Sequence, residues 1–187
     1  MSDSAIAAIA RINSRISEIE SATRQAGANV LGAKVLGPST LGSQVASQPA
    51  FSVPAISAPS GEIAPSGVDT RQFATDLLNR VGAPVTDSNV TAIRAWIKAE
   101  GTKADFNPLA TVRKAPGATD FNKVGVKNFT NYAQGVEYTA QALQNGLYGN
   151  VLQALYQGTS SMEVANAIEN SPWGSGSLVK QVLNSWK

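Results

Sequence analysis

The chain contains neither cysteine nor histidine. Without cysteine there is no disulfide and no thiol nucleophile, and without histidine there is no Ser-His-Asp triad. Zinc sites built from these two residue types are excluded as well. We expect no bound metal or cofactor, because the sequence also has no run of alternating acids of the calcium-loop type. Carboxylates, hydroxyls, amides and amines are therefore the groups that remain for any chemistry.

Charge is also scarce, at 15% of residues with a net charge of +2. Basic and acidic residues are well mixed, so there is no basic stripe, and we expect no nucleic-acid partner. No apolar run is long enough to span a membrane. The first residues do not resemble a secretory signal, because Asp3 and Arg11 interrupt them. We therefore expect a target outside the cytoplasm to be reached by another route.

Residues 1–25 form the first of three segments, and residues 4–24 predict an amphipathic helix. Isoleucines follow the a/d spacing of a heptad, at positions 9, 12, 16 and 19. Isoleucine at both a and d favours trimers or larger bundles, and so short a helix is marginal alone. We expect this helix to form a homo-oligomer or to join a larger assembly. The alternative is that it docks on its own domain.

Residues 26–67 form the second segment, which is rich in Gly, Ser, Ala and Pro and has almost no charge. Such a composition predicts an extended linker. Its scattered Val, Leu, Phe and Ile residues indicate that it lies along a partner surface in an assembly.

Residues 68–187 form the third segment, and their hydrophobic periodicity predicts an all-α domain. We expect helices over the ranges 69–81, 88–99, 131–145, 148–157, 160–169 and 176–186. Residues 101–130 interrupt this pattern with an irregular stretch, in which 125–129 has the character of a short extended piece. An irregular stretch of this length inside a compact domain is often functional.

Glu100 ends an apolar helix at the start of that irregular stretch. Trp96 precedes it by one helical turn, and a carboxyl packed against indole and away from water favours the protonated form that a general acid needs. The carboxyl end of the helix acts in the same direction. The alternative is a solvated residue at a helix end, paired with Lys103.

Most glycosidases need a second carboxylate. Asp105, Asp120 and Glu137 are the candidates, but the first two have turn-like surroundings and the third lies on a predicted helix. None stands out. A mechanism with a single acid is therefore open, in which one glutamate protonates the leaving oxygen and then acts as base while a hydroxyl of the substrate attacks.

These residues carry a family resemblance. Glu100-Gly101 followed by Phe106-Asn107-Pro108-Leu109-Ala110 resembles the Glu-Ser-x-Phe-Asn-Pro-x-Ala motif of lysozyme-like lytic transglycosylases. The segment 125–137 is similar to the glucosaminidase branch of that superfamily. The whole stretch 86–176 resembles lysozyme-like domains of actinobacterial phages and their hosts. Glycine replaces the serine of the motif, the spacing to Phe106 is longer, and a Gly-Leu-Met-Gln element is missing.

The resemblance implies a lysozyme-like fold in which Glu100 is the sole catalytic acid/base. It also implies that Asn107 shapes the substrate cleft and that Tyr132 matches a cleft tyrosine. Our further candidates for sugar contacts are Asn128, Tyr148 and Trp173, because aromatic faces and amides suit pyranose rings and N-acetyl groups. The alternative for the last two is packing in the core.

The function that we expect is a peptidoglycan-cleaving muramidase or lytic transglycosylase carried in the virion on a phage tail. Its partners would be glycan strands and, through residues 4–24 and the linker, other structural proteins of the tail. Export through a flagellar-type channel to a rod is the alternative location. The alternative function is a structural or glycan-binding tail-tip protein that keeps the fold without turnover.

Overall fold

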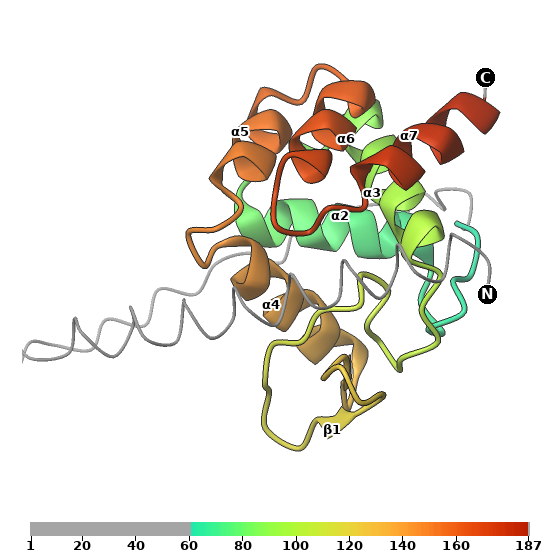
Figure 1. Ribbon diagram of the computed structural model, residues 1–187, viewed down its shortest axis with the longest axis vertical. Coiled ribbons are helices and arrows are strands. Elements are labelled where there is room, and N and C mark those ends of the chain that lie inside the picture. Colours follow the sequence, from blue (N-terminus) through green and yellow to red (C-terminus); the bar gives the residue numbers. More distant parts are fainter. Residues whose placement is uncertain (1–60, 187) are drawn as a thin grey trace, which may run out of the picture.

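A computed structural model describes residues 61–186 of the chain (Figure 1). Within that range the protein is mostly helical, with six helices and one two-stranded sheet. This confirms the all-α class. The helix predicted over residues 4–24 and most of the linker predicted over 26–67 lie outside the described residues. No helix among residues 61–186 is long and apolar enough to cross a membrane.

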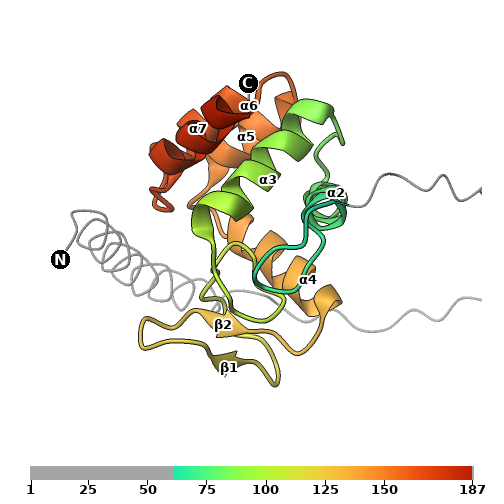
Figure 2. The ribbon, with the colours of Figure 1, turned by 90° about the vertical axis from the view of Figure 1, so that its right-hand side faces the viewer.

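Helix α3 (Asp87–Glu100) is the central element. In Figure 2 it runs between α2 on one side and α5, α6 and α7 on the other. The helix begins at Thr86, whose hydroxyl accepts a hydrogen bond from the backbone N–H of Asn89. It ends at Gly101, which adopts a left-handed conformation with φ 55° and donates its N–H to the carbonyl of Ile97. The carboxylate of interest therefore lies in the last turn.

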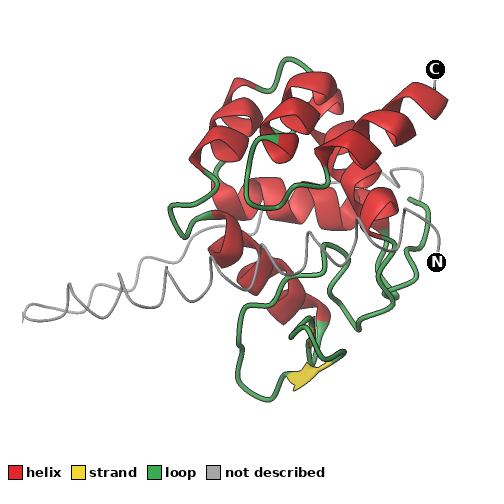
Figure 3. Cartoon of the chain, viewed as in Figure 1, coloured by secondary structure: helices red, strands yellow, loops and turns green. Residues whose placement is uncertain are grey.

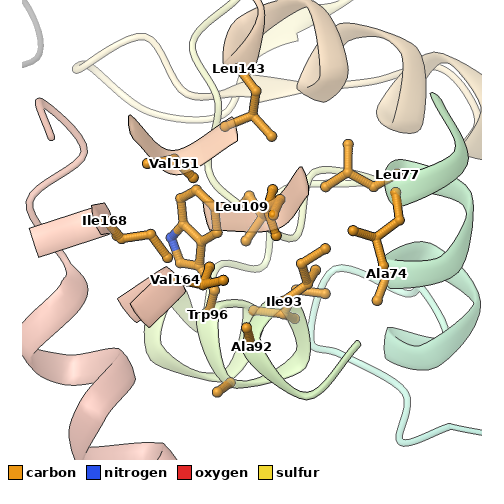
Figure 4. Close-up of a cluster of buried hydrophobic side chains, with 14 of the residues drawn as sticks. Ala74, Leu77, Ala92, Ile93, Trp96, Leu109, Leu143, Val151, Val164 and Ile168 are labelled. Carbon is orange, nitrogen blue, oxygen red and sulfur yellow. The ribbon is translucent and has the colours of Figure 1, made fainter. Parts of the chain in front are cut away.

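The buried face of α3 follows the helical period, with Val90, Ile93, Trp96 and Ile97 inside. Trp96 is fully buried. Figure 4 shows its indole among apolar side chains from several elements, including Leu109, Val151, Val164 and Ile168. Replacing a buried tryptophan with alanine costs about 3–5 kcal/mol. Trp96 therefore anchors the core as well as lying beside Glu100.

The remaining helices lie where the periodicity predicts them, within a few residues. They are α2 (Thr70–Val81), α4 (Tyr132–Leu143), α5 (Gly149–Gln157), α6 (Ser161–Glu169) and α7 (Gly176–Ser185). α2 packs against both α3 and α4, whereas α6 and α7 pack against each other and against α3. The α2–α4 contact carries an ion pair between Arg80 and Glu137. α3 therefore contacts α2 of the α2–α4 pair as well as both helices of the α6–α7 pair.

Residues 101–131 form a small lobe below α3 (Figure 3). Here β1 (Thr119–Asp120) pairs antiparallel with β2 (Lys127–Asn128), the strand that lies within the predicted extended piece. The lobe has its own apolar cluster of Ala104, Ala110 and Val126. This cluster explains why an irregular stretch of this length is ordered.

Residues 61–67, which the sequence assigns to the end of the linker, contact the domain. Ala64 and Ser66 are buried, and the carbonyl of Ser66 accepts a hydrogen bond from the N–H of Phe106. The carboxylate of Asp69 caps α2 and also accepts from the N–H of Gly61. Packing against the lobe therefore begins before residue 68.

Candidate functional site

The Glu100 carboxylate connects the carboxyl end of α3 to the loop between α6 and α7. Its Oε1 accepts three hydrogen bonds, from the indole N–H of Trp96 at 3.2 Å, the indole N–H of Trp173 at 3.0 Å and the hydroxyl of Ser175 at 2.8 Å. All three donors belong to buried residues. Glu100 and Trp173, which meet here, are 73 residues apart in the chain.

The contact with Trp96 is polar, which differs from the expected packing against an apolar indole face. Its N–H edge points at the carboxylate, because a helical residue four positions earlier presents its side chain to the same side. Donors of this kind satisfy an ionised oxygen as well as the carbonyl oxygen of a neutral carboxyl. Because the three bonds go to Oε1, Oε2 is the atom on which a transferable proton would reside.

Close backbone contact fixes the loop that supplies Trp173 and Ser175. Gly174 turns the chain with φ 69°, and Gly176 begins α7 directly against α6. A Cβ on Gly176 would lie 2.3 Å from the carbonyl oxygen of Ala165. Only glycine permits this approach, which sets the position of Ser175 against Glu100.

Trp173 contacts two other aromatic rings. Its ring lies edge-on to Trp96 with centroids 4.7 Å apart, and 5.2 Å from the ring of Tyr148. It is 3% exposed and Tyr148 is 8% exposed. Both side chains therefore lie mainly in the core beside Glu100, and their predicted contact with a sugar stays a prediction.

Asn107 fixes the lobe that follows Glu100. Its amide nitrogen donates to the carbonyls of Thr111 at 2.8 Å and Lys127 at 2.6 Å, and its oxygen accepts from the N–H of Thr111 at 2.9 Å. The residue is fully buried. Its hydrogen-bonding groups are thus engaged with the backbone of the lobe, and the predicted role of Asn107 in shaping a substrate cleft stays a prediction.

Two non-glycine residues of the lobe have left-handed backbone conformations, Phe106 with φ 52° and Ala110 with φ 53°. Each such residue costs roughly 1 kcal/mol or more, and strain of this type gathers at functional sites. The carbonyl of Phe106 also approaches Gly135 of α4 so closely that a Cβ there would lie 2.0 Å from it. The lobe is therefore held in a strained conformation by a specific contact with α4.

Asn128 and Tyr132 lie on either side of the connection from the lobe to α4. Asn128 accepts from the N–H of Asp105 at 3.0 Å and holds the hairpin to the rest of the lobe. Tyr132 donates its hydroxyl to Asp76 of α2 at 2.7 Å. Burial, followed by this hydrogen bond, raises the pKa of Tyr132 above its ordinary value. Within residues 61–186 no hydrogen bond joins Asn107, Asn128 or Tyr132 to Glu100.

The three alternative carboxylates lie elsewhere. Asp105 is exposed in the lobe, Asp120 pairs with Lys127 in the hairpin, and Glu137 pairs with Arg80 between α4 and α2. The guanidinium of Arg80 is the main cause that lowers the pKa of Glu137 from its ordinary value. Within residues 61–186, none of the three forms a hydrogen bond with Glu100. Residues 61–186 also contain no cluster of three or more acidic side chains able to hold a metal ion.

Ser175 is the member of the site that the sequence did not reveal. It lies between two glycines in Trp173-Gly174-Ser175-Gly176, a pattern that predicts only a turn. No local spacing relates it to Glu100, because the two meet through the packing of α3 against α7. Its hydrogen bond to Glu100 becomes visible only in three dimensions.

Comparison of the chain with protein-family models, with curated proteins and with solved structures finds no match.

Proposed function

We propose that this chain is a peptidoglycan-cleaving muramidase or lytic transglycosylase that uses Glu100 as its general acid and base. The observation that supports the proposal is the placement of Glu100: a lone carboxylate in the last turn of α3, whose Oε1 accepts three hydrogen bonds and which a strained lobe follows directly in the chain. General acid–base catalysis by a positioned side chain contributes about 10²–10⁴ in rate. The three hydrogen bonds hold this carboxylate in one orientation, which is one requirement of such a group.

Since no second carboxylate accompanies Glu100 among the described residues, the mechanism that fits is the one with a single acid. Glu100 gives its proton to the glycosidic oxygen as the bond to the anomeric carbon breaks. The resulting carboxylate then takes a proton from the attacking hydroxyl as that oxygen bonds to the same carbon. If the hydroxyl belongs to the substrate the product is a cyclic anhydro sugar, and if it belongs to water the product is a hydrated one.

The location that we propose is a phage tail, where residues 4–24 and the linker (26–67) would connect the domain to other tail proteins. This part of the proposal rests on the family resemblance and on the isoleucine pattern near the N-terminus. The alternative location is a rod reached through a flagellar-type export channel. In both cases the domain would act on the cell wall at close range.

A second candidate function is a structural or glycan-binding module without turnover. The same three hydrogen bonds favour it, because they also make Glu100 a polar link between α3 and the α6–α7 loop. A link of this kind needs an acceptor oxygen and no proton transfer.

The variant Glu100→Gln separates the two functions. Glutamine keeps an oxygen that can accept all three hydrogen bonds, but it cannot donate and recover a proton. If Glu100 is catalytic, we expect the release of soluble fragments from isolated cell walls to fall about 10³-fold while the fold is retained. Glu137→Gln serves as the control, since it removes an equivalent charge far from the site.

Full activity in Glu100→Gln refutes the catalytic role of this residue. If the wild-type chain sediments with cell walls but releases no fragments, the binding module is the better account. Both measurements use the full chain.

A further inference from the structure

A separate cavity lies beside the carboxyl-terminal half of α3. Its volume is about 130 Å³, and it is lined by the segment before α2, by one face of α3 and by the end of the chain: Glu62, Ala64, Pro65, Thr70, Arg94, Ile97, Lys98, Gly101 and Trp186. Lys98 lies two residues before Glu100, so the helical rotation places their side chains on opposite sides of α3. The cavity is thus distinct from the Glu100 site.

Two cations of this cavity lie one helical turn apart. Arg94 and Lys98 share a face of α3, where like charges at this spacing repel each other by a few tenths of a kcal/mol. Neither forms an ion pair with any residue in the range 61–186, although Glu62 lines the same cavity. Arg94 and Lys98 together carry one more charge than Glu62 balances, so the side chains that line the cavity have a net positive charge.

Trp186 lines the cavity just after α7. The residue is 38% exposed, and the charged ends of Arg94 and Lys98 each lie 5.7 Å from the centroid of its ring. At this distance a cation is attracted to the face of an indole. The ring thus keeps both cations beside the cavity, while Ala64, Pro65 and Ile97 make much of the remaining wall apolar.

We propose that this cavity binds a monoanionic carboxylate attached to a small apolar group. The carboxylate would lie between Arg94 and Lys98, where charge-assisted hydrogen bonds are strong, and the apolar group would pack against Trp186. Glu62 disfavours an anion with two charges, because such a ligand would face a negative side chain in the same small space. The carboxyl end of a peptide and a free short-chain acid share this chemistry. The site does not depend on the proposed function of Glu100.

The test is a titration of the full chain followed through the indole N–H signals in the NMR spectrum, with Trp186→Phe used to assign the relevant signal. The probes are acetyl-Ala-Ala, its carboxyl-terminal amide, propanoate and inorganic phosphate. We expect a saturable shift of the Trp186 signal with at least one of the two carboxylates and none with the amide. Binding of acetyl-Ala-Ala but not propanoate identifies a peptide end as the source, and the reverse identifies a free acid.

Lys98→Gln is the decisive variant, because the described side chain of Lys98 makes no hydrogen bond whose loss would disturb the fold. We expect it to weaken carboxylate binding at least tenfold, while Lys123→Gln on the distant hairpin leaves binding unchanged. Glu100→Gln should also bind as the wild type does, so a failed enzyme assay leaves this result unaffected. The proposal is overturned if no carboxylate binds, if the amide binds equally, if phosphate binds more tightly, or if Lys98→Gln has no effect.

Discussion

The contact between Gly135 and the strained lobe gives a sharp prediction about stability. In Gly135→Ala the new Cβ would lie 2.0 Å from the carbonyl oxygen of Phe106, whereas an ordinary contact begins at 3.4 Å. The lobe or α4 must therefore move by about 1.4 Å. Overpacking of this kind costs about 1–3 kcal/mol, and the clash involves backbone that cannot rotate away.

The helix itself offsets part of this cost, since alanine is favoured over glycine in a helix by about 1 kcal/mol. Because the clash is with backbone, we take the overpacking cost in the upper part of its range, about 2–3 kcal/mol, so Gly135→Ala should be less stable by about 1–2 kcal/mol, which lowers the urea midpoint by about 1 M. Gly149→Ala is the matched control, because Gly149 also lies in a helix and a Cβ there meets nothing within 4 Å. It should be as stable as the wild type or slightly more so. Equal midpoints for both variants would refute the close contact.

Three further predictions concern the hydrogen bonds and their dependence on pH. Ser175→Ala removes one donor from Glu100, so we expect a loss of about 1 kcal/mol in the free energy of unfolding by urea, since a typical hydrogen bond contributes about 0.5–1.5 kcal/mol; an unchanged midpoint would contradict this contact. The folded state raises the pKa of Tyr132, so the unfolded chain ionises first and stability should fall as pH rises above the ordinary value of 10.0. Tyr132→Phe should weaken that alkaline loss in thermal melts, and an unchanged pH profile would argue against the bond to Asp76. The folded state lowers the pKa of Glu137, so its contribution is present above the ordinary value of 4.5 and is lost as pH falls below it. Glu137→Gln should flatten that acid limb slightly, because the pair with Arg80 is exposed, and a steeper limb would be inconsistent with the pair.

The elements that the sequence predicted well are those with strong local signals. Thr86 and Gly101 mark the ends of α3, and its apolar spacing places Trp96 and Glu100 on one side of the helix. These relations are visible because each depends on residues within a few positions of one another. The proximity of Trp96 to Glu100 was therefore predictable.

What the sequence could not reveal depends on packing between distant segments. The bonds from Trp173 and Ser175 arise where α3 packs against the segment between α6 and α7, and the burial of Asn107 arises where two parts of the lobe meet around its amide. The close approach of Gly135 to Phe106 has the same origin. No periodicity encodes such contacts, since they follow from which helix faces which neighbour.

A mass spectrum of the soluble fragments released from isolated peptidoglycan by the full chain tests whether Glu100 acts as the acid and base. We predict sugar fragments in the wild-type digest and their near absence in the Glu100→Gln digest, with Glu137→Gln resembling the wild type. The mass of the fragments also tells an anhydro product from a hydrated one. Equal release by Glu100→Gln would contradict the assignment of Glu100 as the acid and base of this site.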